Sequence, residues 1–259
     1  MKNKENCKKI AIITGATGGL GHAFIKELIQ QSLDEIWAFG RNTERLDALV
    51  YEFGNQILPI CKDFTNRHDL ASIEQLLEEQ QPQIQYLINN AGIAKMNASK
   101  ALTISEIESM IDLNCKVPVI LINYCLPYMT RGSKILNICS AAAFQPVPYL
   151  NLYASTKAFE RSYSRALYME LKPLGISVTA VCPSWINTDL LTKEIKGKKV
   201  RFPGIVSPKR VAEQAIKDAN KGKDMSVCSL YVKCQHVNVK LMPQRWTMKI
   251  WMRSIKKYL

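Results

Sequence analysis

The chain has 259 residues, of which 47% are hydrophobic, so it is long enough for one large α/β domain and short for two. Its 35 Lys and Arg against 22 Asp and Glu give a formal net charge of +13, which can attract nucleic acid, an anionic membrane or an acidic small molecule. The excess cations gather in residues 1–9, between Lys193 and Arg201, and from Arg245 onward. They lack the interleaved aromatic residues and motif spacings of nucleic-acid-binding proteins, so we expect no nucleic-acid partner.

Targeting, disulfide and metal signals are weak. The first apolar run, residues 10–13, is too short for a signal peptide, and no eighteen apolar residues stand together. The eight cysteines form no C-x-x-C pair, and several stand inside apolar runs, which is typical of reduced core cysteines in a cytoplasmic protein. His22, His68 and His236 lack ligand spacing, so we expect no metal.

Strand and helix patterns alternate along the chain, without internal repeats or a flexible linker. Strands are predicted at residues 10–14, 35–40, 57–61, 84–88, 134–140 and 177–182. Helices are predicted at residues 20–33, 43–53, 66–80, 103–113, 117–129 and 151–171, with another running from Ser207 to about Gly222. This alternation predicts a single-domain α/β fold, a Rossmann-like doubly wound parallel sheet flanked by helices.

A glycine-rich segment, Thr14-Gly-Ala-Thr-Gly-Gly-Leu-Gly21, joins the first strand to the first helix. Glycine lets the backbone approach a pyrophosphate, and the helix amino terminus offers unpaired N–H groups to it. The alternative is a tight turn with only a structural role. Its position between strand and helix favours dinucleotide binding.

Tyr153 and Lys157 are four residues apart on the predicted helix 151–171, so their side chains lie on one face. A tyrosine with a pKa near 10 is a poor proton donor or acceptor at neutral pH unless a neighbouring cation favours its phenolate. Alone, the pair is more typical of a solvated helix surface. The other motifs decide between these interpretations.

With Asn89-Asn-Ala-Gly92 after the fourth strand and Ser140 after the fifth, the chain resembles the short-chain dehydrogenase/reductase family over about residues 8–190, with a likeness to hydroxysteroid dehydrogenases. The resemblance implies a cofactor site, formed by the glycine turn under the pyrophosphate, an acid at the adenine, and residues beside the ribose: Gly15, Thr17, Gly19, Leu20, Gly21, Asp63, Asn90 and Gly92. It also implies four catalytic positions, matched by Asn114, Ser140, Tyr153 and Lys157.

The chemistry of these four side chains follows from the reaction. Hydride transfer to a carbonyl leaves negative charge on oxygen, so the site needs a hydrogen-bond donor and an acid. Ser140 can supply the first and Tyr153 the second. Lys157 stabilises the phenolate and, by resemblance, holds the cofactor ribose, while Asn114 resembles the residue that anchors a water leading to solvent.

The second strand ends at Phe39-Gly40-Arg41, with no acid where NAD-specific proteins place one. Arginine at this position accommodates the 2′-phosphate of NADP, so NADP(H) is favoured, with NAD(H) possible. After the sixth strand, Pro183 and Thr188 match the family positions near the nicotinamide, although Ser184 replaces the usual glycine.

Two segments bear on the substrate. Residues 190–206 lie where the family carries a mobile substrate lid, and their Lys193, Lys196, Lys198, Lys199 and Arg201 form either a solvated charge run or a site for an acidic substrate group. The usual closing strand with Asp-Gly-Gly is missing; instead residues 241–259 form a basic amphipathic helix, with Arg245, Lys249, Arg253 and Lys257 every fourth residue. This tail either covers the substrate mouth, contacts another subunit, or lies weakly on a membrane surface.

The sequence thus predicts a cytoplasmic NADP(H)-preferring oxidoreductase that interconverts a secondary alcohol and a ketone on a hydroxysteroid-like, bile-acid-like or other extended apolar substrate. A 3-oxoacyl reductase is the alternative enzyme. A non-catalytic dinucleotide sensor is the alternative outside enzymes, but it would not need all four catalytic side chains. The family expectation is a homodimer or homotetramer.

Overall fold

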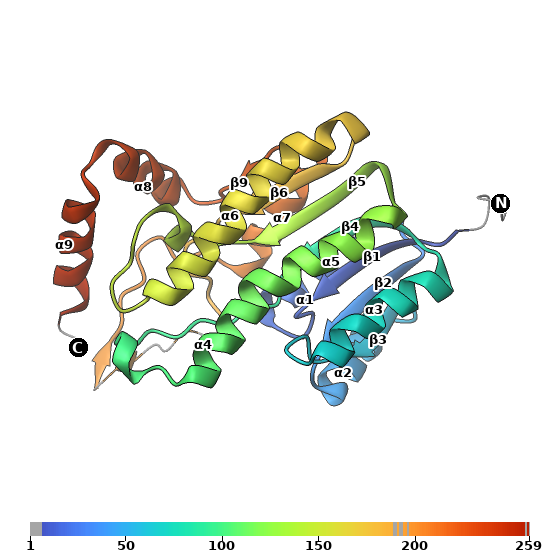
Figure 1. The fold of residues 1–259 in the computed structure, drawn as a ribbon, viewed down its shortest axis with the longest axis horizontal. Helices are drawn as coiled ribbons and strands as arrows, with labels where there is room; N and C mark the ends of the chain where they lie inside the picture. Colours follow the sequence, from blue (N-terminus) through green and yellow to red (C-terminus); the bar gives the residue numbers. More distant parts are fainter. Residues whose placement is uncertain (1–6, 189–190, 192–193, 196, 257, 259) are drawn as a thin grey trace.

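A computed structural model describes residues 7–188, 191, 194–195, 197–256 and 258. Within these residues, seven parallel strands form one sheet in the order β3-β2-β1-β4-β5-β6-β9 (Figure 1). Their bounds are β1 Lys9–Thr14, β2 Glu35–Gly40, β3 Ile57–Cys61, β4 Gln83–Asn89, β5 Met129–Ile138, β6 Ser177–Val181 and β9 Met225–Ser226. The predicted doubly wound parallel sheet is confirmed.

Helices pack on both faces of this sheet, because residues in a strand alternate between its two sides. On one face, Ile10 and Ile12 of β1 pack with buried side chains of α3, α5 and α6. On the opposite face, Ala11 and Ile13 pack with buried side chains of α1, α2 and α7. The helix bounds are α1 Gly19–Leu28, α2 Thr43–Phe53, α3 Arg67–Gln80, α4 Ile104–Ile111, α5 Val117–Cys125, α6 Asn151–Leu171, α7 Pro208–Asn220, α8 Leu230–Leu241 and α9 Gln244–Ile255.

The two helices predicted at 103–113 and 117–129 are one continuous helix, because a π-helical turn, Asp112–Lys116, joins α4 to α5. A 3₁₀ turn, Leu126–Tyr128, then leads into β5, which begins five residues before the predicted 134. The continuous stretch Ile104–Tyr128 is long and apolar enough to cross a membrane by length and composition alone. Much of it is buried against the sheet, as expected of a core helix.

The prediction was least accurate after β6. The short strand β9 pairs with β6, so the sheet does have a closing strand although the Asp-Gly-Gly motif is absent. Helix α8 was not predicted, because its apolar residues do not repeat on one face: Leu230, Tyr231 and Val237 are all exposed. Helix α1 ends at Leu28, before the predicted residue 33.

In the lid region, β7 (Glu194–Ile195) pairs antiparallel with β8 (Lys198–Lys199). The predicted lid cations Lys193 and Lys196, and Lys257 of the tail, lie outside the described residues.

All eight cysteines are free. Cys125, Cys139 and Cys182 are buried, as expected of core cysteines, whereas Cys61 on the outermost strand β3 is exposed.

Strands β1 and β4 are neighbours in the sheet, although β2 and β3 come between them in the chain. The chain leaves β1 toward one edge of the sheet and continues from β4 toward the other, which makes the carboxyl ends of these two strands the topological switch point. Ligands bind at this place in open α/β sheets.

Candidate active site

The glycine turn between β1 and α1 has room for glycine alone at two positions. Gly15 has φ +62°, and a Cβ there would lie 3.0 Å from Ala91 Cα. A Cβ on Gly21 would lie 2.3 Å from the carbonyl oxygen of Gly15. The turn is therefore packed directly against its own helix and the end of β4.

Thr14 holds the turn against the segment that follows β4. Its Oγ1 accepts hydrogen bonds from the N–H groups of Asn90 (3.0 Å) and Ala91 (2.9 Å). The side-chain amide of Asn90 donates in return to the carbonyl oxygens of Thr14 and Gly15, both at 3.0 Å. Asn90 thus orients the glycine turn. This role of Thr14 was not predicted, although its position as the first hydroxyl before the glycines was the available signal.

The amino terminus of α1 fits an anionic group. Its N-cap, Gly18, makes no side-chain capping hydrogen bond, and the first turn carries no acid. Unpaired N–H groups and the helix dipole favour a phosphate at such a terminus. Leu20 is buried beneath the turn. Thr188 lies against the first residue of α1, because its Cγ2 is 3.0 Å from the position that a Cβ on Gly19 would take.

Arg41, at the end of β2, and Asp63, just after β3, lie together at the edge of this turn. Arg41 Nη1 is 3.9 Å from Asp63 Oδ2; the Arg41 side chain is largely exposed, whereas that of Asp63 is partly buried. Partial burial raises the pKa of the Asp63 carboxyl, but hydrogen bonds from Thr65 and the charge of Arg41 outweigh it and lower the pKa. Thr17 contacts the same edge, with its Cγ2 3.2 Å from the position of a Cβ on Gly40.

Ser140 lies at the start of the loop between β5 and α6, and Tyr153 lies just after the end of that loop. Ser140 caps the 3₁₀ turn Ala141–Phe144 by accepting from Ala142 N–H at 3.1 Å. The N–H of Ala141 donates to the carbonyl of Pro183 at 2.8 Å, which ties this loop to the segment after β6. Tyr153, in the first turn of α6, is half-buried and packs against the same buried cluster as Ala142, formed by Val147, Leu150 and Ala154.

Lys157 is buried, with only 5% of its surface exposed. Its ammonium donates to the carbonyl of Ile138 at 2.6 Å and to Glu160 Oε2 at 2.8 Å. It also lies 5.9 Å from the ring centre of Tyr153. Burial alone would lower the pKa of Lys157, but the carboxylate of Glu160 outweighs it and raises the pKa, so the amine stays charged.

Asn114 lies in the π-helical turn and is fully buried. Its side chain accepts from the N–H of Ile93 at 2.9 Å and donates to the carbonyl of Ile93 (2.9 Å) and to Thr156 Oγ1 (3.1 Å). A Cβ on Gly92 would lie 3.1 Å from Asn114 Oδ1 and 3.5 Å from Lys157 Nζ. Because Gly92 has no side chain, the segment that follows β4 lies close to the side chains of both Asn114 and Lys157.

Helix α9 reaches this site from the far end of the chain. Trp251 donates from its indole N–H to the carbonyl of Pro148 at 2.8 Å and packs against the buried cluster of Val147, Leu150 and Ala154, on which Tyr153 also packs. The tail helix was predicted, but the packing of Trp251 on this cluster was not. The structure thus gathers the predicted site residues at the carboxyl edge of the sheet and adds Glu160, which was not predicted, and Trp251 from the predicted tail helix.

This fold and site are those of an NAD(P)-dependent oxidoreductase, and the family follows from comparison with known proteins. Residues 9–199 match the family model for short chain dehydrogenases. The chain therefore belongs to the short-chain dehydrogenase family.

Relatives support the same assignment. The chain is 34% identical over 195 residues to the very-long-chain 3-oxoacyl-CoA reductase of Anas platyrhynchos, covering 70% of this chain and 60% of that protein. It superposes with a TM-score of 0.77 on the short-chain dehydrogenase of Sphingobium yanoikuyae in complex with NADPH, at 28% identity, covering 90% and 92% of the two chains. For the 3-ketoacyl-(acyl-carrier-protein) reductase of Brucella melitensis complexed with NADH, the TM-score is 0.70 at 26% identity, covering 82% and 90%.

Proposed function

We propose that the chain catalyses NADP(H)-linked interconversion of a secondary alcohol and a ketone, with an extended apolar substrate. The observation that carries the proposal is the gathering of Ser140, Tyr153, Lys157 and Asn114 beside the glycine turn at the switch point of the sheet. A non-catalytic sensor of dinucleotides would not need these four side chains together.

The residues of the glycine turn and its surroundings fit a nicotinamide dinucleotide. The uncapped amino terminus of α1 would hold the pyrophosphate, Asp63 the adenine, and Asn90, Gly92 and Lys157 the nicotinamide ribose. Pro183 and Thr188 would border the nicotinamide. When bound, this cofactor supplies or accepts the hydride.

Ser140 and Tyr153 would act on the substrate oxygen. The Ser140 hydroxyl donates a hydrogen bond to it, and Tyr153 gives its phenolic proton as negative charge develops. In the reverse direction the Tyr153 phenolate takes the proton of the alcohol. Ser140 is already fixed by its capping bond to Ala142, so its oxygen is held in place at the mouth of the site.

Lys157 would favour the phenolate of Tyr153, since its charged ammonium lies close to that ring. The side chain of Asn114 is engaged with Ile93 and Thr156, which fixes the π-helical turn. We assign to Asn114 the anchoring of a water through which the proton of Tyr153 is replaced.

Preference for NADP(H) would come from Arg41. Its guanidinium is exposed at the end of β2, where no acid stands to bind a ribose 2′-hydroxyl. A 2′-phosphate there would form a charge-assisted contact with Arg41. Asp63 Oδ2 lies 3.9 Å from the Arg41 guanidinium at the same edge.

The apolar substrate would lie between the lid and Trp251. Two substrate classes fit this description. The similarity to 3-oxoacyl reductases supports 3-oxoacyl thioesters. The bulky apolar side chain of Trp251 supports hydroxysteroids or bile acids. In the lid, Lys199 and Arg201 are tied to the tail, because Tyr258 donates to the carbonyl of Lys199 at 3.1 Å and accepts from the N–H of Arg201 at 3.4 Å. The tail would therefore close the substrate mouth.

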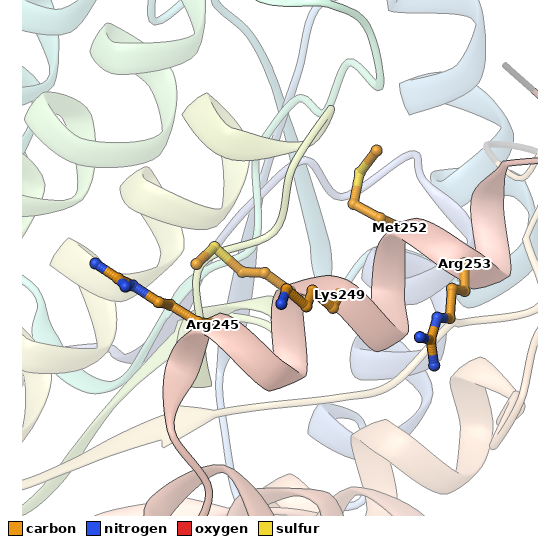
Figure 2. A pocket seen from close by; sticks show the side chains of 5 residues that line it. Arg245, Lys249, Met252 and Arg253 are labelled. Atoms are coloured by element: carbon orange, nitrogen blue, oxygen red, sulfur yellow. The ribbon is translucent and has the colours of Figure 1, made fainter.

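The outer face of α9 would contact an anionic membrane surface. A pocket of about 440 Å³ along this helix is lined by Arg245, Met248, Lys249, Met252 and Arg253 (Figure 2). Trp246 and Ile250 are 61% and 56% exposed beside these cations. The sequence has no acid after Asp224, so nothing in this segment opposes the attraction.

We also propose a cytoplasmic, homo-oligomeric enzyme.

A substrate panel tests the proposal. Purified protein is incubated with NADPH and with steroids, bile acids, short ketones and 3-oxoacyl thioesters, and cofactor absorbance is followed. We expect turnover of an extended ketone and its loss, by at least about a hundredfold, in Tyr153→Phe with NADPH binding retained. Near-normal activity of Tyr153→Phe would refute the assignment.

A further inference from the structure

The buried carboxylate of Glu160 has no part in the proton transfer described above, yet it lies directly against Lys157. Only 3% of Glu160 is exposed, and its Oε2 accepts from the Lys157 ammonium at 2.8 Å. An ammonium has three N–H groups, and two of those of Lys157 are taken by Glu160 and by the carbonyl of Ile138. Glu160 and Ile138 thus fix the direction of the third N–H.

Burying a carboxylate is costly, so a residue at this position with only a packing role would be apolar. Its neighbours on the inner face of α6 include Ala154, Leu167 and Leu171. The helix is anchored here by other polar contacts: Ser164 Oγ donates to the backbone carbonyl of Glu160 at 2.6 Å and accepts from Asn137 at 2.8 Å. The carboxylate itself is therefore not needed to hold the helix in place.

The charge of Glu160 bears on Tyr153 through Lys157. Lys157 favours the Tyr153 phenolate with its positive charge, and a carboxylate bonded to the same ammonium opposes that effect. We propose that Glu160 is a positioning residue that fixes the Lys157 ammonium and tempers its charge, and so sets the pH range in which Tyr153 exchanges its proton. This inference rests on the proposed proton transfer by Tyr153.

Two thiols beside the pair, those of Cys115 and Cys139, are neutral at physiological pH. Cys115, from the π-helical turn, has its thiol pKa raised to about 11, first by burial and then by the charge of Glu160. Burial likewise raises the pKa of Cys139, at the end of β5, well above its ordinary value. Burial raises the pKa of Glu160 to about 6 against the attraction of Lys157, so Glu160 is charged above that pH and neutral below it.

The first test compares Glu160→Gln with Glu170→Gln, a matched control on the exposed part of the same helix. In the direction of alcohol oxidation, the rate rises with pH as Tyr153 loses its proton. We expect Glu160→Gln to move the midpoint of this rise to lower pH by about one unit, because the carbonyl of Ile138 still holds the Lys157 ammonium and no carboxylate opposes its charge. Glu170→Gln should match the wild type, and Glu160→Asp, which keeps the charge, should restore most of the wild-type midpoint. An unchanged midpoint in Glu160→Gln would overturn the inference, even if kcat fell.

The second test needs neither turnover nor a Glu160 variant that folds. Protein labelled with ¹³C at the tyrosine Cζ is titrated without cofactor, and the Tyr153 signal is assigned by its loss in Tyr153→Phe. We expect this signal to shift between about pH 5 and 7 as Glu160 gains its proton. A Tyr153 signal that stays constant over this range would overturn the inference while leaving the proposed function intact. Conversely, an inactive enzyme whose Tyr153 signal still shifts would count against the proposed function alone.

Discussion

The β1–α1 turn offers a sharp comparison between two glycines three residues apart. A Cβ on Gly21 would lie 2.3 Å from Gly15 O and 2.7 Å from Ala16 O, whereas a Cβ on Gly18 would lie 3.5 Å from Gly15 O. Ordinary carbon contacts lie at about 3.5 Å. The helix α1 in Gly21→Ala must therefore move by about 1 Å away from the turn, and overpacking of this kind costs about 1–3 kcal/mol.

Thermal unfolding and NADPH fluorescence titration measure the two consequences. For Gly21→Ala we expect a fall in Tm of about 2–10 °C. We also expect at least about a tenfold rise in the Kd of NADPH, since the displaced N–H groups are those proposed to bind its pyrophosphate. Gly18→Ala should stay within about twofold of the wild-type Kd, because Gly18 has φ −80°, which alanine adopts freely. Wild-type NADPH affinity in Gly21→Ala would refute the placement of the pyrophosphate at this turn.

Three further changes test other parts of the site. Arg41→Ala should raise the KM for NADPH about tenfold or more and leave that for NADH nearly unchanged; an equal effect on both would remove Arg41 from cofactor selection. Gly92→Ala should lower kcat, because its Cβ would press on Asn114 Oδ1 at 3.1 Å; wild-type steady-state rates would argue against that coupling. A double variant, Arg245→Glu with Lys249→Glu, should abolish flotation with anionic liposomes, while the same changes at Lys217 on α7 and at its C-cap Lys221 should not; equal partitioning of all forms would exclude the membrane contact.

Local sequence determined the elements that carry the site. The spacing of Tyr153 and Lys157 places them on one face of α6, because residues four apart in a helix are neighbours whatever surrounds the helix. The glycine turn was equally readable, since the need for a positive φ at Gly15 and for close approach at Gly21 comes from the backbone itself. The alternation of strands and helices then fixed a parallel sheet.

Elements with weak local signals were missed for the same reason. Strand β9 has two residues and exists through its pairing with β6, and α8 has apolar residues scattered around its surface. The π-helical turn that joins α4 to α5 depends on Asn114, whose side chain bonds to the backbone of Ile93 and to Thr156. Neither pairing nor these bonds leaves a periodic pattern in the sequence.

The tertiary structure alone decided which side chains meet at the reacting end of the sheet. Glu160 stands three residues after Lys157, so the ion pair was possible from the sequence, but only the fold buries both partners. Trp251 packs on the same buried cluster as Tyr153, although nearly a hundred residues of chain separate them, and Thr14 bonds to Asn90 from a neighbouring strand. The helical and strand periods in the sequence indicate which residues share one face of an element. Which other element packs on that face depends on the path of the whole chain, because burial and the contacts it brings exist only after the sheet and its helices have packed.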